Sequence, residues 1–325
     1  MVMFDYVIEK IESAQLTDDP FRHIYIEDLF SPQHFSEIVS AEEIALPPRE
    51  SDSALFDLLF ERGYKIINFP GCITDKTKYI EWHKNRKRTA ATHSTCEGFG
   101  VTLRLEEPQT GILAKIKEFL SSDAFNEAVA GKFGVPVSEI FLDNGIQKYL
   151  DGYEISPHPD NRKKALTFMI NVNPHSGAEE LKHHTQYLSL KPEYRYVKTF
   201  WQFNSDCETC WIPWEWCDTV SVQSKNNSIV IFAPSCETLH GVKASYNHLA
   251  GQRTQLYGNL WYREVGELTR VEWQDLDIRA RAGKERNWPS LKSSVAALLP
   301  PRSRRFLKQA LRRDSKTVVK LRLKE

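Results

Sequence analysis

The chain has 325 residues, of which 41% are hydrophobic and 26% charged, as in an ordinary globular protein with one large domain or two smaller ones. No apolar run approaches the roughly 18 residues that a membrane-spanning helix needs, and six cysteines are too few for a disulfide scaffold. The acidic start, with Asp5, Glu9 and Glu12, lacks the basic and apolar regions of a secretory signal. We therefore expect a cytoplasmic protein with reduced thiols.

The net charge of zero hides an uneven distribution. Residues 302–325 hold ten of the 43 Lys and Arg residues and two of the 43 acidic residues, which leaves 33 basic against 41 acidic residues in the rest of the chain. On a helix, Leu307, Ala310 and Leu311 would form a narrow apolar strip among the cations. Such a basic tail could lie on an anionic membrane surface or against the acidic body of its own or another subunit. A solvated end is an equally good interpretation. We do not expect nucleic-acid binding, because no recognition motif accompanies the charge.

The N-terminal part, residues 1–137, is predicted to be a helical and mixed region that supports the rest of the chain. Apolar residues recur at helical spacing over residues 4–11, 112–120 and 125–133, and the last of these helices should end at Gly134. Ser31 and Pro32 form a typical helix start ahead of Phe35, Ile38 and Val39.

From residue 138 the pattern changes to short strands, which we predict at 140–149, 165–172, 228–232 and 254–262. Residues 138–265 should form the core of the protein, interrupted by a Trp-rich insertion over 175–225 that is too long for a plain connection.

Cys207, Cys210 and Cys217 lie in this insertion. A zinc site is a weaker interpretation of them than free thiols, because no second Cys-x-x-Cys accompanies them. His183 and His184 are predicted to be solvated loop residues. Residues 266–325 should form a helical extension that carries the basic tail.

The stretch "SPHPDNRKKALTF", residues 156–168, carries the strongest chemical signal. His158 and Asp160 lie two apart on an extended chain, so their side chains point to the same side. Two histidines and one carboxylate on one face of the metal are the ligands of non-haem Fe(II) oxygenases, which leave the other face open. The stretch "SIVIFAPSCETLHGVKA" places His240 after a strand and a turn, where it can supply the third ligand.

Arg253 heads an otherwise uncharged, aromatic strand, "GQRTQLYGNLWY", thirteen residues after His240. A buried guanidinium is costly unless a carboxylate meets it, and a bidentate pair suits its geometry. Since an Fe(II) site of this kind normally works with 2-oxoglutarate, we predict that Arg253 binds the distal carboxylate of that co-substrate. Lys243 and Gln255 are the next candidates.

His158-x-Asp160, then His240, then Arg253, resemble the 2-oxoglutarate/Fe(II)-dependent oxygenase superfamily, particularly its prolyl-4-hydroxylase-like branch, over about residues 140–262. The resemblance implies an α+β protein built on a double-stranded β-helix, a jelly-roll or cupin-like barrel, with Fe(II), 2-oxoglutarate and O2 as cofactor and co-substrates. It also implies a co-substrate contact for Tyr149. Asn171 stands where many relatives have a second tyrosine that contacts the co-substrate, and the resemblance implies the same contact for Asn171, although its residue type departs from the family pattern.

Because the carboxylate of Asp160 is present, the resemblance implies hydroxylation or desaturation of a C–H bond rather than halogenation. Two alternatives stay open: a non-catalytic cupin-like sensor that keeps the metal, and a zinc hydrolase with the same His/Asp/His set. The substrate is either a small molecule or a side chain. Arg162, Lys163 and Lys164 follow the proposed ligands directly, so the substrate could carry an anionic group, or these residues could form a solvated rim.

Overall fold

A computed structural model describes residues 3–85, 99–204 and 207–263 of the protein. All of them belong to one compact unit, Met1–Val271. A second unit, Glu272–Glu325, lies outside the described residues, and with it the predicted helical extension and basic tail. Among the described helices, none is long and apolar enough to cross a membrane.

Helices and strands alternate along the described chain. The α-helices are α1 (Asp5–Ser13), α2 (Pro32–Ser40), α3 (Asp52–Glu61), α4 (Lys76–Asn85), α5 (Gly111–Leu120), α6 (Asp123–Phe133) and α7 (Tyr196–Phe203). The strands are β1 (His23–Ile26), β2 (Lys65–Ile66), β3 (Thr102–Leu105), β4 (Ile140–Tyr149), β5 (Glu154–His158), β6 (Lys164–Asn171), β7 (Thr185–Leu190), β8 (Cys217–Val222), β9 (Ile229–Phe232), β10 (His240–Lys243) and β11 (Arg253–Tyr262).

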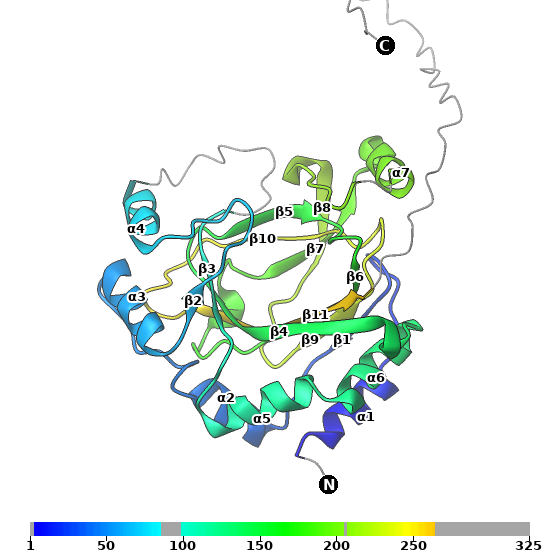
Figure 1. Ribbon diagram of the computed structural model, residues 1–325. Helices are drawn as coiled ribbons and strands as arrows, with labels where there is room; N and C mark the ends of the chain where they lie inside the picture. The colour runs from blue at the N-terminus through cyan, green and yellow to red at the C-terminus, as the bar shows by residue number, and fades with distance from the viewer. Residues whose placement is uncertain (1–2, 86–98, 205–206, 264–325) are drawn as a thin grey trace, which may run out of the picture. The chain divides into compact units, whose positions relative to one another are not determined.

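The strands form two antiparallel sheets, which confirms the predicted mixture of helices and sheet. The large sheet has the order β1-β9-β6-β11-β4-β3-β2, and the small sheet has the order β5-β10-β7-β8. From β4 onward the chain passes back and forth between the two sheets, with only β7 and β8 following each other in the same one. Figure 1 shows the small sheet facing the large one. This arrangement places residues of both sheets around a shared interior.

The centre of the large sheet agrees closely with the strand predictions. β4 and β11 pair along their full length, from Arg253 opposite Tyr149 to Tyr262 opposite Ile140. Successive side chains of a strand point to opposite faces. Even-numbered residues such as Ile146, Leu256 and Leu260 therefore join the main hydrophobic core, while odd-numbered ones face the small sheet.

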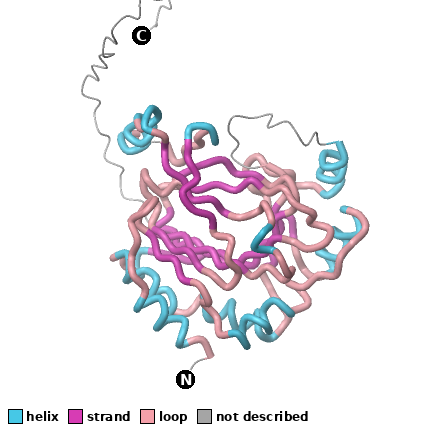
Figure 2. The backbone as a smooth tube through the Cα atoms, turned by 180° about the vertical axis from the view of Figure 1, so that it is seen from behind, coloured by secondary structure: helices cyan, strands magenta, loops and turns pink. Residues whose placement is uncertain are grey.

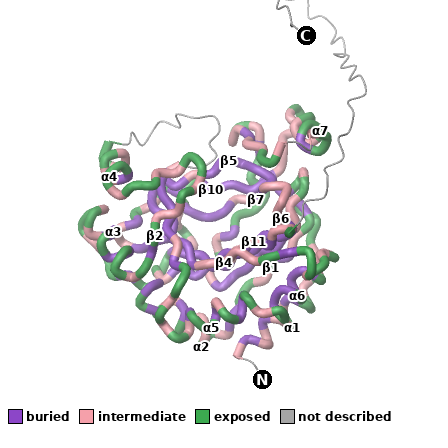
Figure 3. The backbone as a smooth tube through the Cα atoms, in the orientation of Figure 1, coloured by how far each residue is buried: buried purple, intermediate pink, exposed green. Residues whose placement is uncertain are grey.

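Four helices, α1, α2, α5 and α6, lie against the large sheet on the side away from the small sheet (Figures 1 and 2). Their boundaries have local causes. The hydroxyls of Ser31, Ser51 and Ser122 accept hydrogen bonds from the first-turn N–H groups of α2, α3 and α6. Gly134, where the end of this helix was predicted, ends α6 in the left-handed conformation, with φ of 68°. Figure 3 shows the buried residues of these helices on the side of the sheet and the exposed residues facing outward.

The N-terminal region does more than cover the sheet with helices. β1, β2 and β3 supply three of the seven strands of the large sheet, and β3 pairs directly with β4. The insertion over 175–225 is likewise structured: it contains β7, α7 and β8, and two of these form half of the small sheet. The domain boundaries at 137/138 and 265/266 stay predictions.

Candidate active site

His158 and His240 lie directly opposite each other on neighbouring strands of the small sheet. β5 is an edge strand, where a proline is tolerated because no ladder N–H is needed on its open side. The carbonyl of Pro157 instead accepts a hydrogen bond from the N–H of Ile212, at 2.9 Å. Sheet pairing thus fixes the separation of the two imidazoles, whose ring centroids are 4.3 Å apart.

The ring nitrogens of both histidines are oriented by the backbone. Nδ1 of His158 lies 2.8 Å from the carbonyl oxygen of Ser156, and Nδ1 of His240 lies 3.0 Å from that of Thr238. A carbonyl can only accept, so each Nδ1 donates and each Nε2 keeps a free lone pair. Burial, together with the neighbouring His158, lowers the pKa of His240 to about 3, which keeps its imidazole neutral, as a metal ligand must be.

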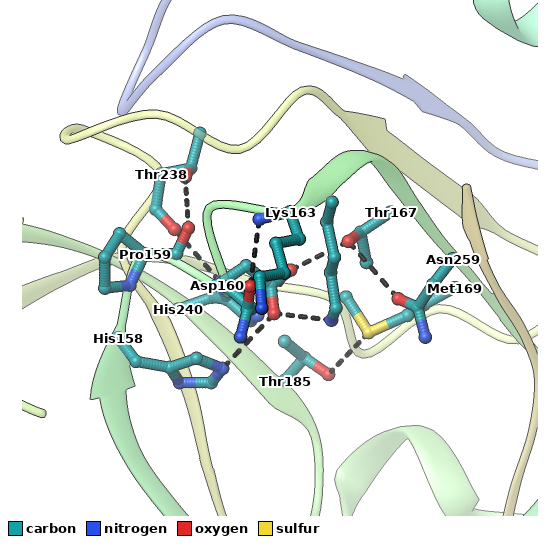
Figure 4. A network of polar contacts seen from close by, with 12 residues as sticks. His158, Pro159, Asp160, Lys163, Thr167, Met169, Thr185, Thr238, His240 and Asn259 are labelled. Carbon is teal, nitrogen blue, oxygen red and sulfur yellow. Dashed lines mark hydrogen bonds and ion pairs between the residues drawn. The ribbon is translucent and has the colours of Figure 1, made fainter. Parts of the chain in front are cut away.

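Asp160 occupies the turn after β5 with φ of 72°, a left-handed conformation that Asp adopts more readily than most residues. Its carboxylate faces Nε2 of both imidazoles, at 3.6 Å from that of His158 and 3.8 Å from that of His240 (Figure 4). Lys164 and the hydroxyl of Thr167 each donate to it at 2.7 Å. Burial alone would raise the pKa of Asp160, but the ammonium of Lys164 holds it well below its usual range.

These three side chains fit a metal ion. The Nε2–oxygen separations of 3.6 and 3.8 Å are too long for direct hydrogen bonds, and the ligand atoms all lie within 4.8 Å of one another. The donor set of two imidazoles and one carboxylate suits Fe(II) and also Zn(II). The structure therefore brings His158, Asp160 and His240 together as predicted from their spacing.

A cavity of about 400 Å³ adjoins the three residues and is enclosed by both sheets. Arg253, at the start of β11, reaches into it from the large sheet and is only 1% exposed. One nitrogen, Nη2, donates to the hydroxyl of Thr185 at 2.9 Å, whereas Nε and Nη1 have no hydrogen-bond partner among the described residues. Burial lowers the pKa of Arg253. A buried guanidinium with unused donors in a cavity is a site for an anion.

The other predicted co-substrate residues divide into two groups. Tyr149 and Gln255 line the cavity: the Tyr149 ring lies under the Arg253 guanidinium at 4.4 Å, and Oε1 of Gln255 is buried without a partner among the described residues. The wall of the cavity, as described, does not include Asn171. The amide nitrogen of Asn171 donates to two loop carbonyls, and its amide oxygen accepts from Gln255 at 2.8 Å. These contacts give no support to a co-substrate role for Asn171. Lys243 is exposed, with its ammonium 3.7 Å from Glu154.

Several residues that complete this site were not found from the sequence. The hydroxyl of Tyr246 accepts from the N–H of Arg253 at 2.9 Å and donates to the carbonyl of Tyr149. Trp211, from the insertion, packs its ring 4.8 Å from that of His158 and lines the cavity. Their only sequence signal is membership in aromatic clusters, which core residues share.

The three cations after Asp160 have partners in the structure. Arg162 stacks on Trp201 at 3.8 Å and donates to the carbonyls of Trp201, Asn204 and Cys207, so it holds the insertion in place. Lys163 pairs with Glu208 at 2.5 Å. Of the three, Lys164 alone lines the cavity, and its ammonium is already bound to Asp160.

The prediction that His183 and His184 are solvated is wrong. They are 2% and 7% exposed, and the ring of His183 packs 4.7 Å from that of Tyr246 and 4.4 Å from that of His184. None of their four ring nitrogens has a hydrogen-bond partner among the described residues. Burial lowers the pKa of His183 to about 2 and that of His184 to about 4. The free thiols of Cys207, Cys210 and Cys217 do not belong to either group of metal-ligating side chains found in the described chain.

The second of these groups lies away from the cavity wall as described. It consists of Asp52 at the start of α3, His83 in α4 and His248 in the loop before β11. Nδ1 of His83 lies 2.8 Å from Asp52, Nε2 of His248 lies 2.7 Å from Asp52, and Nε2 of His83 lies 2.9 Å from Asp151.

Neither a family model nor a curated protein matches the chain. Similar solved structures include a Pseudomonas putida prolyl-4-hydroxylase, at 9% identity, a TM-score of 0.39 and coverage of 80% of this chain and 100% of that one. A Trichoplax adhaerens prolyl hydroxylase, in complex with a peptide fragment of the hypoxia inducible factor oxygen degradation domain, is 12% identical with a TM-score of 0.36, covering 80% of this chain and 88% of that one. The epimerase SnoN, in complex with Fe3+, alpha ketoglutarate and nogalamycin RO, is 10% identical with a TM-score of 0.37, covering 85% and 93%. These structures are of the kind that the sequence resembles, and their low TM-scores leave the function to be argued from the site itself.

Proposed function

We propose that the protein is a 2-oxoglutarate- and Fe(II)-dependent dioxygenase that hydroxylates an unactivated C–H bond. The overall reaction consumes the substrate, O2 and 2-oxoglutarate, and yields the hydroxylated substrate, succinate and CO2. The alternation of β4 to β11 between two facing antiparallel sheets supports a double-stranded β-helix as its core.

One observation carries the proposal: a buried anion site and a His/Asp/His set share one cavity. His158, Asp160 and His240 would hold the metal. Arg253, with unpartnered Nε and Nη1, would bind the distal carboxylate of 2-oxoglutarate, assisted by the hydroxyl of Thr185. Bound together, Fe(II) and 2-oxoglutarate supply the oxidising power for the reaction. A zinc hydrolase has no evident use for the buried guanidinium.

The residues of the chain contribute binding and orientation. Backbone carbonyls fix both imidazoles with their lone pairs toward Asp160. Lys164 and Thr167 hold the carboxylate of Asp160 in its ionised form. Trp211 packs against His158 and limits access of water from the side of the insertion.

The decisive experiment is to purify the full-length protein without oxygen, determine its metal content, and follow succinate formation from 2-oxoglutarate after Fe(II) and O2 are added. An oxygenase forms succinate slowly even without its substrate, whereas a metal-binding sensor forms none. A zinc hydrolase would retain Zn(II) and leave 2-oxoglutarate intact. Either of the latter results would refute the proposal.

Arg253→Leu provides a sharper test of the co-substrate site. Loss of a charge-assisted pair worth about 1.5–3 kcal/mol should raise the apparent constant for 2-oxoglutarate about ten- to a hundredfold. Lys243→Leu is the matched control, because Lys243 is an exposed cation at the end of β10, the preceding strand in the sequence, and should leave the constant unchanged. An effect in Lys243→Leu without one in Arg253→Leu would reverse the assignment.

A further inference from the structure

A second pair of charges lies in the same cavity. Arg104 comes from β3 and Asp143 from β4, with Nη1 of the arginine 3.3 Å from Oδ1 of the aspartate. Tyr257, on β11, places its ring 4.8 Å from the guanidinium and its hydroxyl 3.4 Å from the carboxylate of Asp143. All three line the cavity, and none contributes to the proposed metal or 2-oxoglutarate contacts.

The position of the guanidinium depends on Gly145. A Cβ at this residue would lie 3.3 Å from the Tyr257 ring and 3.4 Å from Cγ of Arg104. Without it, the aliphatic stem of Arg104 crosses β4 and its guanidinium stacks on the tyrosine. A cation held over an aromatic face in this way is oriented before any ligand arrives.

Both charges have unused binding capacity. The guanidinium has five N–H donors, and Nε of Arg104 is buried without a partner among the described residues. Its contact with Asp143 is slightly longer than a normal N–H···O bond. The side chains are 20% and 37% exposed, which leaves them accessible to a molecule in the cavity. A loosely matched ion pair of this kind can accept a ligand that brings both charges.

Arg104 and Asp143 lie close enough to the proposed metal ligands for one small molecule to contact both places. Thr167, which holds Asp160, pairs across the sheet with Asn259, and Asn259 pairs with Asp143 (Figure 4 shows Thr167 and Asn259). With strands spaced by about 4.8 Å, the backbone of β4 is about 10 Å from that of β6, and the backbone of β3 is about 14 Å from it. A small molecule anchored at Arg104 and Asp143 could therefore extend one of its carbons to the metal centre.

We propose that Arg104 and Asp143 bind the head group of an α-amino acid substrate, with the carboxylate on Arg104 and the ammonium on Asp143. For the reaction this inference rests on the proposed function, whereas the binding itself does not. A ligand with adjacent opposite charges satisfies both residues. A ligand with only one charge binds one residue of the pair and weakens its contact with the other residue, which is left without a full counter-charge.

The first experiment screens a mixture of the proteinogenic L-α-amino acids against the full-length protein by ligand-observed NMR, with 2-oxoglutarate present and Zn(II) added to prevent turnover. Calorimetry then compares the amino acid that binds best with its amide and with its deaminated acid. We expect each analogue to bind about tenfold more weakly than the amino acid, since each loses one charge-assisted contact.

Two variants should show reciprocal losses. Arg104→Gln should weaken amino-acid binding about tenfold or more and abolish the preference over the amide. Asp143→Asn should abolish the preference over the deaminated acid. Lys65→Gln is the control, because Lys65 is an exposed cation opposite Arg104 on β2 and is not part of the cavity wall as described.

Equal weakening of all three ligands by both variants would indicate a structural role and overturn the assignment, as would a wild-type protein that binds no amino acid. These outcomes are separate from the test of the proposed function. Succinate formation without amino-acid binding refutes only this subsite, and reciprocal binding losses without succinate formation refute only the oxygenase activity.

Discussion

Two clusters in this protein contain the same residue types, two histidines and an aspartate, yet their geometry suits different roles. In the cluster of His158, Asp160 and His240, the imidazoles stand 3.6 and 3.8 Å from the carboxylate. In the other, every imidazole–carboxylate contact is between 2.7 and 2.9 Å. The first set of separations leaves room for an ion between the groups, whereas the second is a set of direct hydrogen bonds.

The second cluster shows how hydrogen bonding decides whether a histidine can bind metal. The N–H of Asp151 donates to Nδ1 of His248 at 3.2 Å, so the proton of that ring is on Nε2 and points at Asp52. His83 lies between Asp52 and Asp151 and donates from both nitrogens. These two carboxylates raise the pKa of His83 to about 9, which makes it an imidazolium and not a ligand.

Whether a histidine can bind a metal ion therefore depends on the group that contacts its other ring nitrogen, and not only on which residues form the cluster. Backbone carbonyls at Ser156 and Thr238 leave lone pairs at the proposed metal centre. In the second cluster, the N–H of Asp151 occupies the lone pair of His248, and the second carboxylate, that of Asp151, keeps both nitrogens of His83 protonated. The hydrogen bonds of this cluster instead connect α3 and α4 to the loops before β5 and β11.

The largest expected effect is on metal binding. Anaerobic titration with Co(II), followed by absorbance and calorimetry, should show one ion per chain. His158→Ala and His240→Ala should each abolish this binding, because a facial site that loses one imidazole keeps only two protein ligands.

His248→Ala is the matched control, a buried histidine in the cluster that should not bind metal. It should keep the stoichiometry of one. Two ions bound by the wild-type protein, or loss of binding in His248→Ala alone, would show that the geometric distinction between the clusters is wrong.

The next effect is on stability. His83→Gln removes the cation between Asp52 and Asp151, whose side chains are 13% and 11% exposed, and leaves two carboxylates close together. We expect urea denaturation to show a loss of about 2–3 kcal/mol, somewhat less than for a fully buried pair. Adding Asp151→Asn should recover part of it.

Lys76→Gln, on the same helix, is the control. It breaks an ion pair with Asp57, whose side chain is 68% exposed, and should cost less than about 1 kcal/mol. A cost for His83→Gln no larger than that of the control would mean that the second cluster is only a set of surface contacts.

The proposed metal centre could be predicted from the sequence, whereas the second cluster could not. β4, β6, β9 and β11 are long and apolar enough to be predicted, and their order puts Arg253 beside Tyr149. The short spacing of His158 and Asp160 indicated two of the three proposed metal ligands, and the third, His240, follows a strand and a turn in the sequence. Asp52 and His248 are 196 positions apart and belong to no periodic pattern, so nothing local could reveal their contact.

The same limit explains the wrong prediction for His183 and His184. Adjacent polar residues next to a glycine-containing turn are typical of solvated loops, and only the packing of the insertion buries them. Thr185 and Tyr246 were missed for a related reason: their hydroxyls acquire a role only through Arg253. The hydroxyl of Thr185 accepts from its guanidinium, and that of Tyr246 accepts from its backbone N–H.

The smallest expected effect is on the pH dependence of stability, where two groups, the half-buried His83 and the buried Lys148, act in opposite directions. The folded protein holds the proton of His83 more tightly than the unfolded chain, with a pKa of about 9 against 6.5. The stabilisation of the folded protein by His83 is therefore complete below pH 6.5 and is lost as the pH rises through 9.

Burial lowers the pKa of Lys148 from 10.5 to about 7, although its ammonium donates to the Ile44 carbonyl and the Thr254 hydroxyl at 2.8 Å. The unfolded chain then binds the extra proton, so the contribution of Lys148 rises between pH 7 and 10.5.

Urea midpoints of the wild type, His83→Gln and Lys148→Met, measured between pH 6.5 and 9, separate the two contributions. The stability difference between wild type and His83→Gln should shrink as the pH rises, because the advantage of the imidazolium is lost. The difference between wild type and Lys148→Met should move the other way, in favour of the wild type, as the buried ammonium loses its proton. Each comparison uses the slope with pH and not the absolute cost, since Lys148→Met also removes two buried hydrogen bonds. If the difference between wild type and His83→Gln does not shrink as the pH rises, His83 is not held as an imidazolium between its two carboxylates, and the contrast with the neutral His240 fails.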